Sequence, residues 1–197
     1  MAPMRRPRLV LASASETRLR VLRQAGFDPL VAPSHVDETL ASADPAVAVT
    51  DLAHRKATAV AATYPDDLVL GCDSVVVLGD RIVGKPSSRD EARSWWHDMR
   101  GGTVTVWTGH ALVRGDRSCS GARSADVHFE PVLEDDLTAY LDTGDWSGAA
   151  GGFRLDGRAA VFVDSITGDP GTVHGVCLPW LRAALDELDV DVRSLWV

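Results

Sequence analysis

The chain has 197 residues and a mass of 21.1 kDa, a size that predicts one domain or two tightly joined parts. Lys and Arg number 20 against 28 Asp and Glu, and the resulting net charge of −8 argues against a protein that coats nucleic acid with a basic face. Hydrophobic residues make up 45% and charged residues 24%, which excludes intrinsic disorder. A small anionic ligand held by a few local cations remains compatible with this composition.

The apolar segments are too short for a membrane protein, since none approaches the roughly 20 residues that span a bilayer. Arginines precede the apolar segment 9–14 and resemble the start of a signal peptide, but the segment is too short for one. The odd number of cysteines, without paired spacing, favours buried thiols in a reducing compartment: Cys72, Cys119 and Cys177. We therefore expect a cytoplasmic protein.

Predicted strands and helices alternate along the whole chain. In the first half, strands are expected at 8–12, 28–32, 68–78 and 81–83, and helices at 16–24 and 44–63. In the second half, helices are expected at 89–99, 133–143 and 178–188, strands at 103–113, 124–129 and 159–166, and a glycine-rich loop at 144–157. The alternation predicts an α/β protein, and the hairpin turn at Gly79-Asp80 makes its sheet mixed. We expect a mixed, twisted central sheet flanked by helices.

The first candidate site is the segment Ser13-Ala14-Ser15, which joins a strand to a helix that carries Arg18 in its first turn. The start of a helix presents unpaired N–H groups and a partial positive charge, which attract phosphate. Arg18 would add a permanently charged guanidinium. The alternative is that a serine merely caps the helix and Arg18 is a solvated charge.

The second candidate is Asp73, which interrupts an apolar strand where a carboxylate is costly to bury without a cation. Such a carboxylate commonly binds a hard metal such as magnesium, although a structural Asp beside Gly71 is the alternative. Lys85, between a strand end and Pro86, could be a fixed phosphate-binding charge or part of a surface turn. Lys56 is the only other lysine in an arginine-rich chain, which suggests that both are required as lysines.

Other polar and aromatic residues give weaker signals. The six histidines are scattered and are interpreted as surface or loop positions, with only His35 left open. Core positions are favoured for the tryptophans, among them Trp95, Trp96, Trp146, Trp180 and Trp196.

Taken together, the motifs resemble the Maf family of nucleoside triphosphate pyrophosphatases. The resemblance covers residues 8–188 and rests on Leu9–Arg18, Val36–Glu38, Leu52–Lys56, Gly71–Ser74, Gly84–Pro86, Thr108-Gly109 and Gly168–Pro170. It implies a fold with an active-site cleft between two lobes, with residues 1–7 as an N-terminal tail and 8–197 as a single two-lobed domain. It also implies a homodimer and a divalent metal, Mg²⁺ or Mn²⁺.

The implied reaction is hydrolysis of a nucleoside triphosphate to a nucleoside monophosphate and pyrophosphate. The family's motifs fall on Ser13, Ser15, Arg18, Lys56 and Lys85 as triphosphate-binding residues and on Glu38 and Asp73 as metal ligands. Asp73 is also the expected base or orienting group for the attacking water, and the catalytic set is Arg18, Glu38, Lys56, Asp73 and Lys85. We expect these residues to converge around one triphosphate.

The sequence departs from the family pattern at several positions. Glu16 and Thr17 replace a proline and an arginine, and Gly102 and Val104 stand where the family has a basic residue and a histidine. Asp156 stands where the members that act on dTTP and UTP have glutamine, and it resembles the type that acts on 7-methyl-GTP. An ionised Asp only accepts hydrogen bonds, so it favours a base with N–H donors, such as a guanine edge.

Two other functions fit parts of the sequence. A non-catalytic regulator of cell division that only binds nucleotide would explain the motif losses. A sugar-nucleotide transferase would share the opening segment, but it needs a glycine-rich phosphate loop, and Ser13-Ala14-Ser15 contains no glycine.

Overall fold

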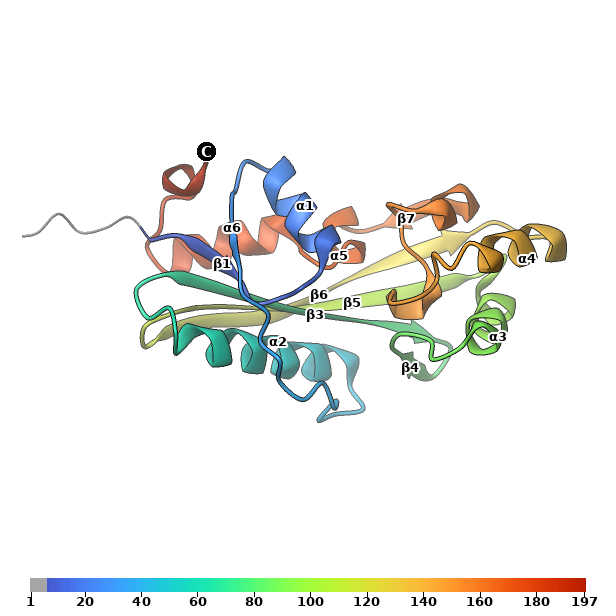
Figure 1. The fold of residues 1–197 in the computed structure, drawn as a ribbon, viewed down its shortest axis with the longest axis horizontal. Helices are drawn as coiled ribbons and strands as arrows, with labels where there is room; N and C mark the ends of the chain where they lie inside the picture. Colours follow the sequence, from blue (N-terminus) through green and yellow to red (C-terminus); the bar gives the residue numbers. More distant parts are fainter. Residues whose placement is uncertain (1–6) are drawn as a thin grey trace, which may run out of the picture.

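The computed structural model describes residues 7–197, which form a mixed α/β fold on one seven-stranded sheet (Figure 1). The strands are β1 (Leu9–Leu11), β2 (Leu30–Val31), β3 (Leu68–Leu78), β4 (Arg81–Val83), β5 (Thr103–Arg114), β6 (Arg117–Phe129) and β7 (Val163–Thr167). Their order is β2-β1-β3-β5-β6-β7, with β4 also paired to β3. The strand β1 is parallel to both its neighbours, and all other pairs are antiparallel. The expected mixed sheet is confirmed.

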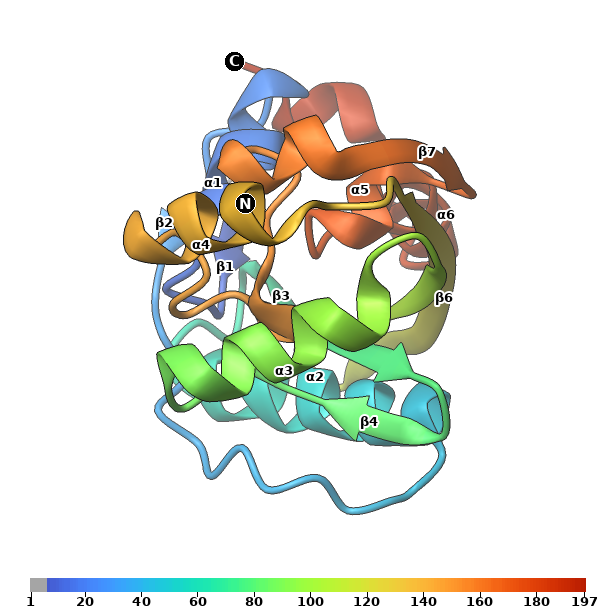
Figure 2. The same ribbon diagram turned by 90° about the vertical axis from the view of Figure 1, so that its right-hand side faces the viewer.

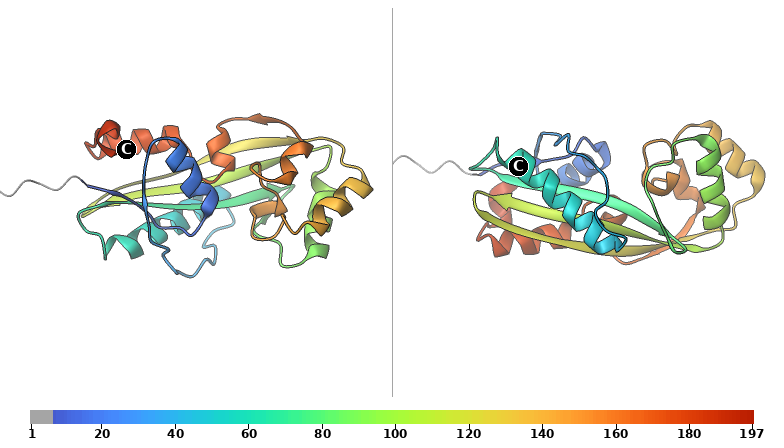
Figure 3. Two further views of the ribbon diagram at one scale, coloured as in Figure 1. Left: turned by 45° about the horizontal axis from the view of Figure 1, so that its top comes forward. Right: turned by 90° about the horizontal axis from the view of Figure 1, so that it is seen from below.

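Helices cover both faces of this sheet. The α-helices are α1 (Glu16–Gln24), α2 (Pro45–Ala61), α3 (Arg89–Met99), α4 (Glu134–Asp142), α5 (Pro170–Val173) and α6 (Leu178–Glu187), with 3-10 turns at Ala150–Gly152, Arg158–Phe162 and Val192–Leu195. Helix α2 lies on one face, and α1 and α6 lie on the other (Figure 1). Helices α3 and α4 gather at one end of the long strands (Figures 2 and 3). The division into two lobes stays a prediction.

The expected strands differ from the observed ones by at most two residues at their ends, except for two that differ more. The strand expected at 124–129 begins at Arg117 and pairs with β5 along its whole length. Its first half is rich in Ser, Gly and Ala, so it lacks the apolar alternation that marks a strand. The strand expected at 159–166 begins only at Val163, because Arg158–Phe162 forms a 3-10 turn. The expected tail at 1–7 lies outside the described residues except for Pro7.

The core has three apolar clusters, each packed against a different group of helices. One lies between the sheet and helices α1 and α6, a second lies under α2, and a third surrounds α3 and α4. Trp95, Trp96 and Trp180 are buried as expected, and Trp146 is partly buried against the third cluster. Trp196 is 52% exposed, so its expected core position is wrong. No helix within residues 7–197 is long and apolar enough to cross a membrane.

Two glycines allow α2 to pack directly onto the sheet. A Cβ atom on Gly71 would lie 2.2 Å from the carbonyl oxygen of Ala53, and one on Gly109 would lie 2.1 Å from that of Val49. Gly109 pairs in register with Asp73 on the neighbouring strand. The close approach of α2 at these glycines therefore brings the next turn of the helix, which carries Lys56, beside Asp73.

Replacing Gly109 with alanine should separate α2 from the sheet. We expect Gly109→Ala to lower the free energy of unfolding by about 2 kcal/mol or more, since the new methyl group would overlap helix backbone that cannot rotate away. Urea unfolding measures this change. Gly84→Ala is the control, because nothing lies within 4 Å of a Cβ atom at Gly84. Equal stability of Gly109→Ala and the parent protein would contradict the described contact.

The interpretation of His110 as a surface residue is wrong. His110 lies on β5, is fully buried, and stacks on Trp180 with ring centroids 4.8 Å apart. Its Nε2 accepts a hydrogen bond from the backbone N–H of Cys177 at 2.9 Å, which identifies this nitrogen as the unprotonated one. Burial and the nearby Arg18 lower the pKa of His110 to about 3. The neutral ring thus holds the start of α6, two residues after Gly175.

The folded protein disfavours protonation of His110. The free energy of unfolding should therefore fall as the solution becomes acidic. Below the usual histidine pKa of about 6.5 the unfolded chain gains a proton that the folded chain does not, so stability should fall by about 1.4 kcal/mol per pH unit toward a pKa of about 3. His110→Gln removes this titration and keeps an acceptor. We expect urea unfolding between pH 7.5 and about 5 to depend less on pH in the variant. The same slope in both proteins would contradict this expectation.

Candidate active site

All eight site residues expected from the sequence line one cavity of about 610 Å³. They come from the start of α1, the segment between β2 and α2, helix α2 itself, the middle of β3, and two later loops: Ser13, Ser15, Arg18, Glu38, Lys56, Asp73, Lys85 and Asp156. Residues that are up to 143 positions apart (13 to 156) therefore meet on one surface. The cavity is large enough for a nucleotide-sized ligand.

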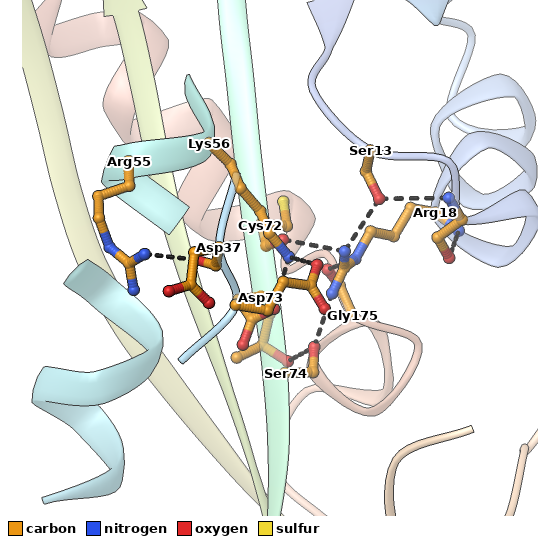
Figure 4. A network of polar contacts seen from close by, with 12 residues as sticks. Ser13, Arg18, Asp37, Arg55, Lys56, Cys72, Asp73, Ser74 and Gly175 are labelled. Atoms are coloured by element: carbon orange, nitrogen blue, oxygen red, sulfur yellow. Dashed lines mark hydrogen bonds and ion pairs between the residues drawn. The ribbon is translucent and has the colours of Figure 1, made fainter. Parts of the chain in front are cut away.

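At the centre of the cavity wall, the ammonium of Lys56 lies between two carboxylates. Its Nζ is 2.8 Å from Oδ1 of Asp73 (Figure 4). The same Nζ is 2.6 Å from Oε1 of Glu38. The Lys56 side chain is only 8% exposed, and Asp73 is 13% exposed, whereas Glu38 is 57% exposed. A buried ammonium requires such partners, because removing an unpaired charge from water is very costly.

The carboxylate of Glu38 is surrounded by positive charge. The pKa of Glu38 is lowered chiefly by the hydrogen bond from Lys56, and the charges of Lys85 and Arg18 lower it further. Glu38 therefore stays ionised in more acidic solution than an ordinary glutamate. All three cations of the expected site thus act on the same carboxylate.

The guanidinium of Arg18 is held by the protein on several sides. Its Nε donates to the carbonyl of Gly175 at 2.9 Å, and its Nη1 donates to the carbonyl of Cys72 at 2.9 Å and to Oγ of Ser13 at 3.0 Å. Its Nη2 donates to Oγ of Ser74 at 3.1 Å (Figure 4). Four of the five N–H groups are therefore used within the chain. Arg18 is a fixed positive charge with little freedom to turn toward a ligand.

The two serines of the first motif have different local roles. Ser15 is the N-cap of α1, and its Oγ accepts a hydrogen bond from the backbone N–H of Arg18 at 3.4 Å. Oγ of Ser13 accepts from the backbone N–H of Ser15 at 3.2 Å and from Arg18. The capping alternative thus describes Ser15, while Ser13 connects the loop to the guanidinium.

Asp156 lies at the rim of the cavity and is paired across to α1. Its Oδ2 forms an ion pair with Arg20 and accepts a hydrogen bond from Oγ1 of Thr17 at 3.0 Å. Thr17 also lines the cavity, where the family has an arginine. The contacts with Arg20 and Thr17 use the same carboxylate oxygen, so Oδ1 of Asp156 can accept from another donor.

The carboxylates of Glu38 and Asp73 fit a Mg²⁺ or Mn²⁺ ion that takes its other ligands from substrate and water. Within residues 7–197 no group of three or more His, Cys, Asp and Glu side chains could enclose a metal ion. Mg²⁺ does not require such a cage, since it is commonly bound by one or two carboxylates plus phosphate oxygens and water. Each carboxylate uses one oxygen for Lys56 and has a second.

Several residues of the site were missed in the sequence. The hydroxyl of Ser74, bonded to Arg18, is also 2.8 Å from Oγ1 of Thr108, which donates to the carbonyl of Thr172 at 2.7 Å. Thr108 and Thr172 are fully buried. A threonine within the apolar strand β5 could have indicated a buried hydrogen-bond network from the sequence alone. His174, interpreted as a surface or loop residue, lies in a turn as expected, but it is only partly exposed and lines the cavity, and burial lowers its pKa.

Comparison with known proteins agrees with these features. The family model described as "Maf-like protein" matches residues 8–188. A protein of Mycobacterium sp. (strain JLS) named nucleoside triphosphate pyrophosphatase is 42% identical over 205 residues, covering 96% of this chain and 98% of the relative. Proteins of the same name from Streptomyces coelicolor and Thermosynechococcus vestitus are each 44% identical, covering 100% and 89% of this chain and 98% and 91% of the relatives. The chain belongs to the Maf family.

Proposed function

We propose that the protein hydrolyses nucleoside 5′-triphosphates to a nucleoside monophosphate and pyrophosphate. The observation that carries this proposal is the cavity itself, where the three expected phosphate-binding cations meet the two expected metal-binding carboxylates in a space of about 610 Å³. The name of its relatives, nucleoside triphosphate pyrophosphatase, points to the same reaction. Family membership over residues 8–188 supports the transfer of that activity to this chain.

The cations would bind the polyphosphate. A triphosphate carries about four negative charges, so it requires fixed positive charge in a confined site. In our proposal, Lys85 contacts phosphate oxygens directly, and Arg18, already bound by the chain, contributes its charge and one N–H. Lys56 has three N–H donors and uses two on carboxylates, so its third can reach the substrate.

Glu38 and Asp73 would hold the divalent cation, Mg²⁺ or Mn²⁺. The ion, when bound, would neutralise phosphate charge and lower the pKa of a coordinated water. The donor set supports this assignment, because hard cations prefer carboxylate oxygens and the two side chains already share one ammonium.

Asp73 would orient the attacking water and accept its proton. The water oxygen forms a bond to the α-phosphorus, the bond from that phosphorus to the bridging oxygen breaks, and pyrophosphate leaves with that oxygen. Asp73 suits this role because it is fixed on a strand and held by Lys56. Lys56 and Arg18 oppose the negative charge that develops on the phosphoryl oxygens.

Loss of the base or of the phosphate-binding lysine should abolish turnover. We expect Asp73→Asn and Lys85→Ala each to lower kcat/KM at least about 100-fold. Phosphate released after addition of inorganic pyrophosphatase measures the reaction, over a nucleotide panel with and without Mg²⁺ or Mn²⁺. Circular dichroism is the control for folding. Unchanged rates in both variants would place the chemistry elsewhere, and binding without pyrophosphate release would favour a non-catalytic regulator.

Asp156 would select the base. We propose that its Oδ1 accepts from an N–H donor, which favours a guanine edge or 7-methyl-GTP over dTTP and UTP. Asp156→Gln supplies a donor as well and should lower the ratio of kcat/KM for GTP to that for UTP by about tenfold. The variant Arg158→Ala serves as the control, because Arg158 is exposed and does not line the cavity of about 610 Å³. An unchanged ratio in Asp156→Gln would contradict this role.

The expected homodimer and cytoplasmic location belong to this proposal. Both follow from the family resemblance and from the three cysteines, which are buried free thiols. Sedimentation equilibrium of the purified protein measures the subunit number.

A further inference from the structure

Glu38 is carried by a segment with little structure of its own. Residues 32–44, between β2 and α2, contain neither helix nor strand. The Glu38 side chain is 57% exposed, so burial does not hold it in place. Its ion pair with the buried Lys56 holds the carboxylate at one point and does not by itself fix the backbone of the segment. Another interaction must fix the backbone if Glu38 is to meet Asp73 reproducibly.

Arg55, the residue before Lys56 on α2, supplies that interaction. Its Nη1 donates to the carbonyl of Asp37 at 2.5 Å, and its Nη2 donates to the carbonyl of Thr39 at 2.9 Å. These two carbonyls lie on either side of Glu38, so one planar guanidinium holds the backbone both before and after it. Figure 4 shows Arg55 reaching Asp37 from the turn of α2 that also carries Lys56.

The guanidinium is itself oriented. Its Nε donates to Oδ2 of Asp51, one helical turn earlier, at 2.8 Å. The turn that it contacts is closed by Asp37, whose Oδ1 accepts from the backbone N–H of Thr39 at 2.9 Å and from its hydroxyl at 2.8 Å. Both partners of the contact are therefore held in place: the Arg55 guanidinium by Asp51 on the helix, and the backbone of 37–39 by the Asp37 side chain.

We propose that Arg55 is a positioning residue that sets Glu38 for metal and substrate. This inference rests on the proposed function, in which Glu38 is a ligand of the divalent cation. Arg55 does not line the cavity, so it acts through the backbone of 37–39 and not by touching substrate. A lysine cannot replace it, because a single ammonium has neither the planar fork nor the span to reach two carbonyls while contacting Asp51.

The competing explanation is that Arg55 is an ordinary helix-surface charge paired with Asp51. That explanation accounts for one of its three contacts and leaves the two bonds to the carbonyls without a role. Arg182 provides a matched comparison, since it forms the same type of pair with Asp186, four positions later on α6, away from the cavity.

The test uses Arg55→Ala, Arg55→Lys and the control Arg182→Ala in the full-length protein. Binding of Mn²⁺ is measured by electron paramagnetic resonance in the presence of a non-hydrolysable nucleoside triphosphate analogue. We expect the dissociation constant for Mn²⁺ to rise about tenfold in both Arg55 variants, as for other groups that orient a metal ligand, and to stay unchanged in Arg182→Ala. Hydrogen exchange at the amides of 38–40 should accelerate at least about tenfold in the Arg55 variants only, with the melting temperature unchanged.

The variant Glu38→Gln distinguishes a failure of the positioning role of Arg55 from a failure of the metal-binding role of Glu38. If Glu38→Gln weakens Mn²⁺ binding while Arg55→Ala leaves both binding and exchange as in the parent protein, the positioning role is wrong and the proposed function stands. If Glu38→Gln itself leaves Mn²⁺ binding unchanged, the metal assignment of Glu38 fails, and the positioning role fails with it.

Discussion

The contact of one buried ammonium with two carboxylates is the constraint on which the rest of the site depends. Lys56 lies within 2.8 Å of both Asp73 and Glu38, and its burial makes these partners obligatory. Three parts of the chain must then meet at one point. Helix α2 reaches the sheet only because Gly71 and Gly109 have no side chain, and the segment that carries Glu38 is held to the same helix by Arg55.

In the proposed function, the site binds a polyanion that arrives with a divalent cation. The side chains that line the cavity include as many carboxylates as cations: Glu16, Glu38, Asp73 and Asp156 against Arg18, Lys56, Lys85 and Arg154. A divalent cation would therefore supply the net positive charge that the about four negative charges of a triphosphate require. Neutral His110 adds no charge, but it fixes the backbone next to the carbonyl that binds Arg18. Much of the chain's polar structure around the cavity therefore serves to hold charges at fixed positions.

The sequence predicted most of the elements and eight of the residues that line the cavity, because its signals were local or matched a family pattern. Asp73 in an apolar strand and two isolated lysines are visible without a structure. The missed features depend on distant residues: His110 is defined by Trp180 and Cys177, and β6 by its pairing with β5. The guanidinium of Arg18, expected to bind phosphate, mostly donates to groups within the chain, and these acceptors come from segments up to 157 positions away. No pattern of a single segment could reveal these contacts.

The most direct measurement of the central claim is a crystal structure with Mg²⁺ and a nucleoside triphosphate whose α–β bridge resists hydrolysis. We expect the metal ion on Asp73 and Glu38, the triphosphate against Lys85 and Arg18, and Lys56 still between the carboxylates and the phosphates. A nucleotide bound outside the cavity, or a metal ion that contacts neither carboxylate, would contradict the account.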